Sequence, residues 1–228
     1  MGIKLVVFDL AGTTVDDSED SVNVCFREAL QEHEIDAPRD LVNSVMGIKK
    51  IHAIQQILKT VAPERATEET ITAVHDLFLQ KINNHYNTSD QVKEIDGVTD
   101  VFQTLKNEGI KVAFNTGFSR STADIIANRL GWYEHNLIDS SACSDEVEKG
   151  RPYPYMIERI MEQLELENTS EVAKIGDTPS DLEEGKNANC GITIGVLYGT
   201  HDREELEGLP HDFLVNQIQD VIPLLVSQ

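Results

Sequence analysis

Polar residues follow three separate apolar runs of this 228-residue chain. Asp9 follows the run at 3–8, Thr116 follows a second run, and the pair Asp177 and Asp181 follows a third. If these runs are neighbouring strands of one parallel sheet, the side chains converge at the carboxyl ends of the strands, where α/β proteins bind ligands. Carboxylate oxygens are ligands that Mg²⁺ prefers. The spacing therefore predicts a magnesium site beside a carboxylate nucleophile.

Two further segments predict a binding site for phosphate. Thr116-Gly117 places backbone N–H groups and a hydroxyl just before a predicted helix. Arg151 also precedes a predicted helix, and arginine can hold phosphoryl oxygens in a fork. Taken singly, each of these groups has an ordinary structural explanation as a helix cap, a turn hydroxyl or a surface charge. Their order and spacing together favour the functional interpretation.

The elements that must position these residues alternate between strand and helix. Strands are expected at 3–8, 111–115, 137–139, 171–175, 192–196 and 213–215. Helical apolar faces lie between them, at about 98–109, 119–131 and 153–166. Repeated βα units predict an α/β fold, a Rossmann-like doubly wound parallel sheet with helices on both faces.

One block interrupts this alternation. From about residue 16 to residue 92 the apolar residues fall on helical faces only, in three successive stripes. The block follows the first strand, so we expect a helical cap domain at 16–92 inserted into a core of 1–15 and 93–228. An inserted domain of this kind can act as a lid over the site.

The net charge of the chain limits the classes of binding partner. The net charge of −21 argues against nucleic acid and against anionic membrane surfaces. A small anionic substrate remains compatible with this charge, because a metal ion and a few local cations can hold it.

We expect a cytoplasmic protein, since no apolar run has the length of a membrane span and the N-terminus does not resemble an export signal. Cys25, Cys143 and Cys190 have no metal-site spacing and are expected to be buried.

The ordered set of motifs resembles the haloacid dehalogenase superfamily of aspartyl-phosphate hydrolases. The matching stretches are Asp9-Leu10-Ala11-Gly12-Thr13, Asn115-Thr116-Gly117, Gly150-Arg151-Pro152 and Gly176-Asp177-Thr178-Pro179-Ser180-Asp181. The resemblance implies Mg²⁺ held by Asp9, the carbonyl of Ala11 and Asp177, with Asp181 orienting the metal's waters or Arg151. It implies that Asp9 attacks phosphorus and that water then releases phosphate. Substrate contacts are implied for Ala11, Gly12, Thr13, Thr116, Gly117 and Arg151.

Two departures from the common pattern resemble the phosphonatase branch, whose members hydrolyse the C–P bond of phosphonoacetaldehyde. Ala11 stands where most phosphatases have a second Asp as general acid, and Arg151 stands where a lysine is usual. That branch uses a cap lysine to form a Schiff base with the aldehyde. The segment Met46-Gly47-Ile48-Lys49-Lys50 resembles its Met-Gly-x-x-Lys sequence, which selects Lys50 and implies substrate contacts at Met46 and Gly47. An iminium ion at Lys50 would withdraw electrons from the C–P bond, so that the leaving group needs no acid.

Several alternatives stay open at this point. Lys49 takes the Schiff-base role if the register differs by one, and the two lysines could equally be a solvated pair at a helix start. The branch has a tyrosine after Thr-Gly, where this chain has Phe118. It also has a histidine one turn past the lysine, and the nearest histidine here, His52, is one residue away from that position. A phosphomonoesterase for a small phosphorylated metabolite, similar to phosphoglycolate phosphatase, would not need Lys50. A catalytically idle phosphate-binding module is the third alternative, to which only Ala11 points. The resemblance also implies a homodimer formed through the cap.

Overall fold

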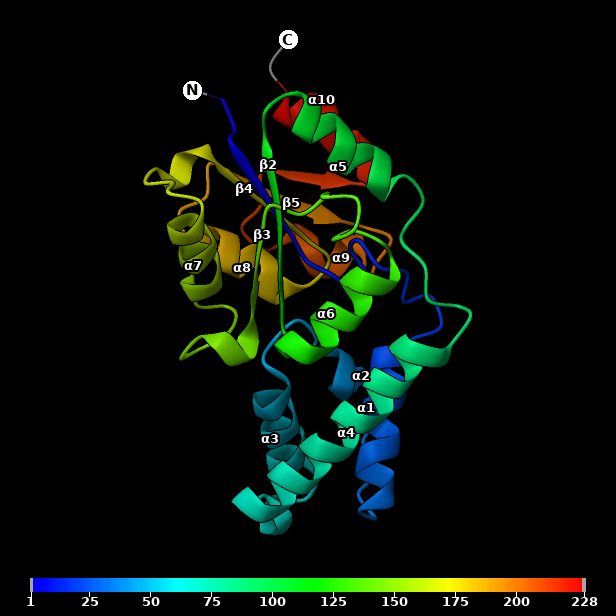
Figure 1. Cartoon of the computed structure of the whole chain (residues 1–228). Coiled ribbons are helices and arrows are strands. Elements are labelled where there is room, and N and C mark those ends of the chain that lie inside the picture. Colours follow the sequence, from blue (N-terminus) through cyan, green and yellow to red (C-terminus); the bar gives the residue numbers. More distant parts are fainter. Residues whose placement is uncertain (1, 227–228) are drawn as a thin grey trace.

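A computed structural model of the protein describes residues 2–226. Within these residues the strands form one six-stranded parallel sheet with the order β3-β2-β1-β4-β5-β6 (Figure 1). The strands are β1 Leu5–Phe8, β2 Lys111–Thr116, β3 Ser140–Cys143, β4 Val172–Gly176, β5 Ile192–Val196 and β6 Phe213–Val215. The predicted α/β doubly wound fold is confirmed. Because β1 lies between β2 and β4, the three strands that carry the candidate site are neighbours, as predicted.

Helices cover both faces of the sheet (Figure 1). They are α5 Val98–Asn107, α6 Arg120–Arg129, α7 Tyr155–Gln163, α8 Pro179–Asn187, α9 Arg203–Glu207 and α10 Ile222–Leu225. Alternate residues of β1 enter two different apolar clusters, Val6 and Phe8 in one and Leu5 and Val7 in the other. A strand buried on both faces explains why this run is apolar without alternation.

The segment between β1 and α5 forms a separate group of helices beyond the carboxyl ends of the strands (Figure 1). These are α1 Ser21–Glu32, α2 Arg39–Asn43, α3 Lys50–Val61 and α4 Glu68–Thr88. Phe26 of α1 stacks on Phe78 of α4 with ring centroids 4.2 Å apart. Where the chain leaves and re-enters the sheet region, the N–H of Asp16 donates to the carbonyl of Lys93 at 3.0 Å. The domain boundaries at 15/16 and 92/93 stay a prediction.

The predicted strand at 137–139 is wrong, because β3 begins at Ser140. The N–H of Asp139 donates to the carbonyl of Val112, and its carboxylate accepts the N–H of Val112 at 2.9 Å. Ladder pairing with β2 starts only after this residue. The strand itself reads Ser-Ser-Ala-Cys, which lacks the β-branched residues used to predict the other strands.

Other expectations differ only in detail. Cys25 and Cys143 are buried as predicted, whereas Cys190 is partly exposed. The helix expected at 153–166 spans Tyr155–Gln163. No helix among residues 2–226 combines the length and the apolar character needed to span a membrane.

Candidate active site

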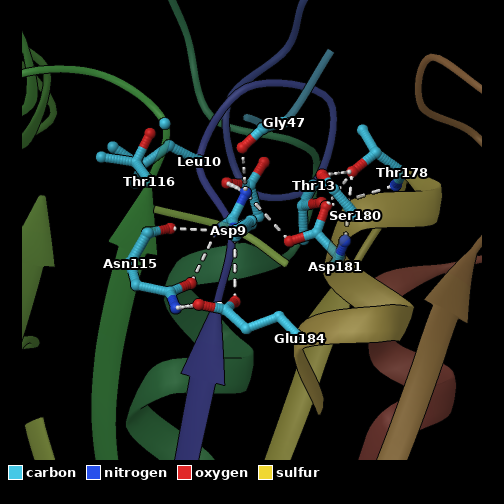
Figure 2. Close-up of polar contacts among 12 residues, drawn as sticks. Asp9, Leu10, Thr13, Gly47, Asn115, Thr116, Thr178, Ser180, Asp181 and Glu184 are labelled. Carbon is cyan, nitrogen blue, oxygen red and sulfur yellow. Dashed lines mark hydrogen bonds and ion pairs between the residues drawn. The ribbon is translucent and has the colours of Figure 1, made fainter. Parts of the chain in front are cut away.

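The nucleophile candidate Asp9 is fixed at the end of β1 by its own backbone. Its N–H donates to the carbonyl of Ile175 at 2.9 Å, and the hydroxyl of Thr14 donates to its carbonyl oxygen at 2.8 Å. Figure 2 shows Asp9 above the end of its strand, with Asn115 on the neighbouring strand and Asp181 and Glu184 on the helix that follows β4. Residues far apart in the sequence therefore meet at one edge of the sheet.

Gly12 and Thr13 lie against Asp177. The hydroxyl of Thr13 donates to Asp177 Oδ1 at 2.8 Å, and the N–H of Thr200 donates to Oδ2 at 2.7 Å. Gly12 has a φ of +85°, and a Cβ at this position would overlap the Asp177 carboxylate. Both the left-handed backbone and the close approach require glycine here. Thr13 thus holds the Asp177 carboxylate by a hydrogen bond, and Gly12 lies against it; the phosphate contacts expected of both residues stay a prediction.

Three buried carboxylates gather at this edge. One oxygen from each of Asp9, Asp177 and Asp181 lies within 4.8 Å of the other two. Burial, reinforced by the negative charges of Asp9 and Asp181, raises the pKa of Asp177 to about 7. Burial also raises the pKa of Asp9, although Arg151 acts in the opposite direction. A divalent cation between these carboxylates would relieve their mutual repulsion. Because all the donor atoms are oxygens, the site fits Mg²⁺.

The three carboxylates do not have equal roles. Asp181 Oδ1 lies 3.0 Å from Arg151 Nη1 and 2.8 Å from Lys174 Nζ. Its Oδ2 accepts the hydroxyl of Thr178 at 2.5 Å. Burial alone would raise the pKa of Asp181, but the charges of Arg151 and Lys174 lower it below its ordinary value. Asp9 and Asp177 therefore fit as metal ligands, and Asp181 fits the orienting role. Ala11 lines the same pocket as Asp9, and a metal contact from its carbonyl stays a prediction.

Arg151 is buried, so its interpretation as a solvated surface charge is wrong. Its Nη1 lies 2.7 Å from Asp9 Oδ1, and its Nε lies 3.0 Å from Glu184 Oε2. Nη1 also donates to the carbonyl of Gly47 at 3.3 Å. These acidic neighbours outweigh the effect of burial and raise the pKa of Arg151 above its ordinary value. One cation thus joins the nucleophile to the core helix α8 and to the segment before α3.

Three residues of this network have no role in the sequence-based predictions: Asn115, which appears there only as part of a motif, and Lys174 and Glu184. Lys174 Nζ donates to Asn115 Oδ1 at 2.8 Å, and Asn115 Nδ2 donates to both carboxylate oxygens of Glu184 at 2.9 Å. Lys174 and Glu184 are both fully buried. The one available signal was a lysine inside the otherwise apolar strand β4. A buried charge needs buried partners, so that lysine pointed to a polar network.

Lys50, at the start of α3, is 5% exposed and faces the core from the cap side. It lines one pocket together with Asp9, Ala11, Met46, Gly47, Thr116 and Gly117. Its Nζ lies 4.8 Å from the centroid of the Phe118 ring and 5.5 Å from that of Phe26. Burial lowers the pKa of Lys50 to about 8, although Asp9 acts in the opposite direction.

Lys49 has a different environment. Its Nζ donates to the carbonyl of Val147 at 3.4 Å, and it does not line the pocket of Lys50. Lys49 and Lys50 are therefore not a solvated pair, because Lys50 is buried in the pocket of Asp9.

Gly117, next to the end of β2, lies against the cap backbone. A Cβ on Gly117 would overlap the carbonyl oxygens of Gly47 and Ile48. Glycine there allows the cap backbone to approach the end of β2.

The pocket is almost filled by its own walls. Its volume is about 20 Å³, which is close to the space of a single water molecule. A substrate that carries a phosphoryl group needs more room. The pocket as it stands therefore has no room for such a substrate.

Comparisons with known proteins agree with this geometry. The sequence matches the haloacid dehalogenase-like hydrolase family over residues 3–189. Phosphonoacetaldehyde hydrolase from Bacillus mycoides (strain KBAB4) is 31% identical over 92% of this chain and 83% of its own length. The enzyme of the same name from Bacillus cereus (strain G9842) is 30% identical over 97% of this chain and 87% of its own length.

Solved structures share the fold. A phosphonoacetaldehyde hydrolase-like protein from Oleispira antarctica has a TM-score of 0.83 at 23% identity, covering 99% of this chain and 92% of its own. A putative phosphoglycolate phosphatase from Lactobacillus delbrueckii subsp. bulgaricus has a TM-score of 0.82 at 16% identity, covering 100% of both chains. The chain therefore belongs to the haloacid dehalogenase-like hydrolases. Within that superfamily it falls in the phosphonatase-like branch.

Proposed function

We propose that the enzyme hydrolyses the C–P bond of phosphonoacetaldehyde or a close analogue. The observation that carries this proposal is the Lys50 amine, buried in the same pocket as the Asp9 carboxylate. Position 11, where a general acid would stand in a phosphate-ester hydrolase, is an alanine in that pocket. A lysine that provides an electron sink removes the need for that acid. The names of the Bacillus relatives support the same substrate.

The chain's own residues account for the steps. The Lys50 amine, whose pKa is lowered to about 8 mainly by burial, adds to the aldehyde carbon and forms an iminium ion with loss of water. An Asp9 oxygen then attacks phosphorus while the electron pair of the C–P bond moves toward the iminium nitrogen, which leaves an aspartyl-phosphate and an enamine on Lys50. Water hydrolyses the aspartyl-phosphate to phosphate, and protonation of the enamine carbon followed by hydrolysis of the resulting imine releases acetaldehyde and the Lys50 amine. Arg151, 2.7 Å from Asp9, stabilises the negative charge on the transferring group. Mg²⁺, held by Asp9, Asp177 and the Ala11 carbonyl, would neutralise phosphoryl oxygens.

The test is product formation from phosphonoacetaldehyde with Mg²⁺ present. We expect equal amounts of acetaldehyde and phosphate from the unmodified enzyme and none above background from Lys50→Ala. The matched control is Lys49→Ala, because Lys49 is adjacent but lies outside the pocket. It should keep most of the activity. Absence of acetaldehyde with the unmodified enzyme would exclude the proposal.

A phosphomonoesterase similar to phosphoglycolate phosphatase is the second candidate. It is favoured by the fact that Asp9, Arg151 and Asp177 are assembled by the core strands and α8 without Lys50. Hydrolysis of a panel of small phosphate esters that survives in Lys50→Ala would support it. Any turnover that depends on both Asp9 and Mg²⁺ would exclude the idle binding module.

A further inference from the structure

Asp17 is a second carboxylate in the pocket of Asp9 and Lys50, and nothing above gives it a function. It lies in the link between the Gly12 turn and α1. Among the described residues that line this pocket, Asp9 and Asp17 are the two acids. Asp9 is paired with Arg151, so Asp17 is the one left to exchange protons with Lys50.

Asp17 also lines a second, larger cavity of about 140 Å³. This cavity is lined by polar groups that include Asp20, Arg39 and Thr200. Asp17 therefore lies between the small pocket of Lys50 and a larger polar cavity with room for water.

The local structure holds Asp17 at this boundary. Its Oδ1 accepts the N–H of Ser21, the first residue of α1, at 2.9 Å. Burial raises the pKa of Asp17 to about 6, although the N–H groups of Ser21 and Val22 and the charge of Lys50 act in the opposite direction. Asp17 thus has a pKa in the range suited to general acid–base catalysis.

Schiff-base formation needs such a group. The Lys50 ammonium must lose a proton before it attacks the aldehyde, and the hydroxyl of the resulting carbinolamine must gain one before it leaves. Phe118 cannot carry a proton, and His52 is exposed and does not line the pocket. Asp9 is needed as an anion to attack phosphorus.

We propose that Asp17 is the proton-transfer residue for Schiff-base formation at Lys50. This inference rests on the proposed function. Asp17 and Lys50 share the pocket without forming an ion pair, so one water carries the proton from the Lys50 ammonium to the Asp17 carboxylate, and the freed amine adds to the aldehyde carbon. The carboxylic acid then gives that proton to the carbinolamine hydroxyl. The C–O bond breaks, the C=N bond forms, water leaves, and Asp17 returns to its carboxylate form.

The reactive form needs Asp17 ionised, so it becomes populated as the pH rises through about 6. The charged groups that act on Asp17 are Asp20 and Lys50. The titratable groups of the cap helices that feel its charge are Cys25 of α1 and Tyr86 of α4. The rate of adduct formation should therefore rise with pH through about 6.

Acetaldehyde with cyanoborohydride tests this step alone, because acetaldehyde has no C–P bond. The rate of adduct formation at Lys50 is followed by peptide mass spectrometry from about pH 5 to about pH 9, with labelling of Lys49 as the internal reference. We expect Asp17→Asn to slow labelling of Lys50 by about 100-fold and to remove the rise near pH 6. An Asn side chain keeps an oxygen that accepts the Ser21 N–H, so α1 should still begin normally.

Asp16→Asn is the matched control. Asp16 pairs with Lys93 at 3.2 Å and does not line the pocket of Lys50, so this variant removes the same charge one residue away and should label at the original rate. If Asp17→Asn does not fold, Asp17→Ser keeps a cap acceptor and should give the same result.

An Asp17→Asn enzyme that labels Lys50 at the original rate, or keeps the rise near pH 6, overturns the inference. So does an unmodified enzyme that forms no adduct at Lys50. An unmodified enzyme that forms the adduct but releases no acetaldehyde from phosphonoacetaldehyde would exclude the proposed function and leave Asp17 as the proton carrier of Lys50.

Discussion

Nη1 of Arg151 lies 2.7 Å from Oδ1 of Asp9, and the same nitrogen lies 3.0 Å from Oδ1 of Asp181. The nucleophile and the acid of α8 are thus held by one guanidinium. Nη2 of the same group donates to the carbonyl of Asn115 at 2.6 Å, at the end of β2. A single side chain therefore joins the ends of β1 and β2 to the first turn of α8.

Arg151→Lys should lower kcat by about 100-fold or more, because an ammonium cannot reach Asp9, Glu184 and Asn115 at once. The measurement is steady-state turnover together with urea unfolding. The control is Arg129→Lys, since Arg129 donates to the carbonyls of Tyr86 and Ser89 away from the site. Turnover of Arg151→Lys close to that of the control would show that the fork geometry is unimportant.

Lys174 and Glu184 should be energetically coupled. Lys174→Met leaves the buried carboxylates of Asp181 and Glu184 with one cation fewer, and should cost about 3–5 kcal/mol of unfolding free energy. Combining it with Glu184→Gln should cost less than the sum of the two single changes, because the unpaired charge is removed. Urea unfolding of the four proteins measures the coupling. Additive losses would contradict the network.

Gly12→Ala tests the contact between the turn and Asp177. The new Cβ meets the Asp177 carboxylate, and the φ of +85° is strained for alanine, so both turnover and the stabilisation by Mg²⁺ should fall sharply. Gly109→Ala is the matched control, because Gly109 has a φ of +76° and nothing within 4 Å of a Cβ. It should lose about 1–2 kcal/mol of stability and keep its activity. Equal activity losses would mean that backbone strain, not the Asp177 contact, explains the effect.

Stabilisation by Mg²⁺ should increase with pH. Burial and nearby acids raise the pKa of Asp177 to about 7, above its value in the unfolded chain. Without metal, the stability that Asp177 contributes is present when it is protonated and is lost as the pH rises through about 7. Mg²⁺ needs the carboxylate, so it should raise Tm more at about pH 8 than at about pH 6. Asp177→Asn should remove most of this difference, and equal shifts at both pH values would contradict the assignment.

The sheet could be predicted well where burial on both faces leaves an unbroken apolar run. This is the case for β1, and β5 and β6 were predicted with their observed bounds. The strand prediction failed for β3. Its Ser-Ser-Ala-Cys sequence carries no strand signal, and its position depends on pairing with β2. That pairing is a tertiary effect, which a local pattern does not contain.

The candidate site could be predicted where one rule governs it, namely that parallel strands end at the same edge. Asp9, Thr116 and Asp177 follow from this rule. Glu184 could not be found, because its role depends on how α8 is rotated against β4. Asp17 lies in an acidic run, Asp16-Asp17-Ser18-Glu19-Asp20, that is typical of a solvated loop. Only the packing of the cap distinguishes it from its neighbours.

The most direct test of the account is to trap the Schiff base in Asp9→Asn. This variant cannot attack phosphorus, so phosphonoacetaldehyde bound at Lys50 should remain as the iminium ion. Borohydride should then fix it, and peptide mass spectrometry should find the full phosphonate-bearing adduct on Lys50 and not on Lys49. An enzyme without an adduct at Lys50, or one labelled equally at both lysines, would contradict the central claim.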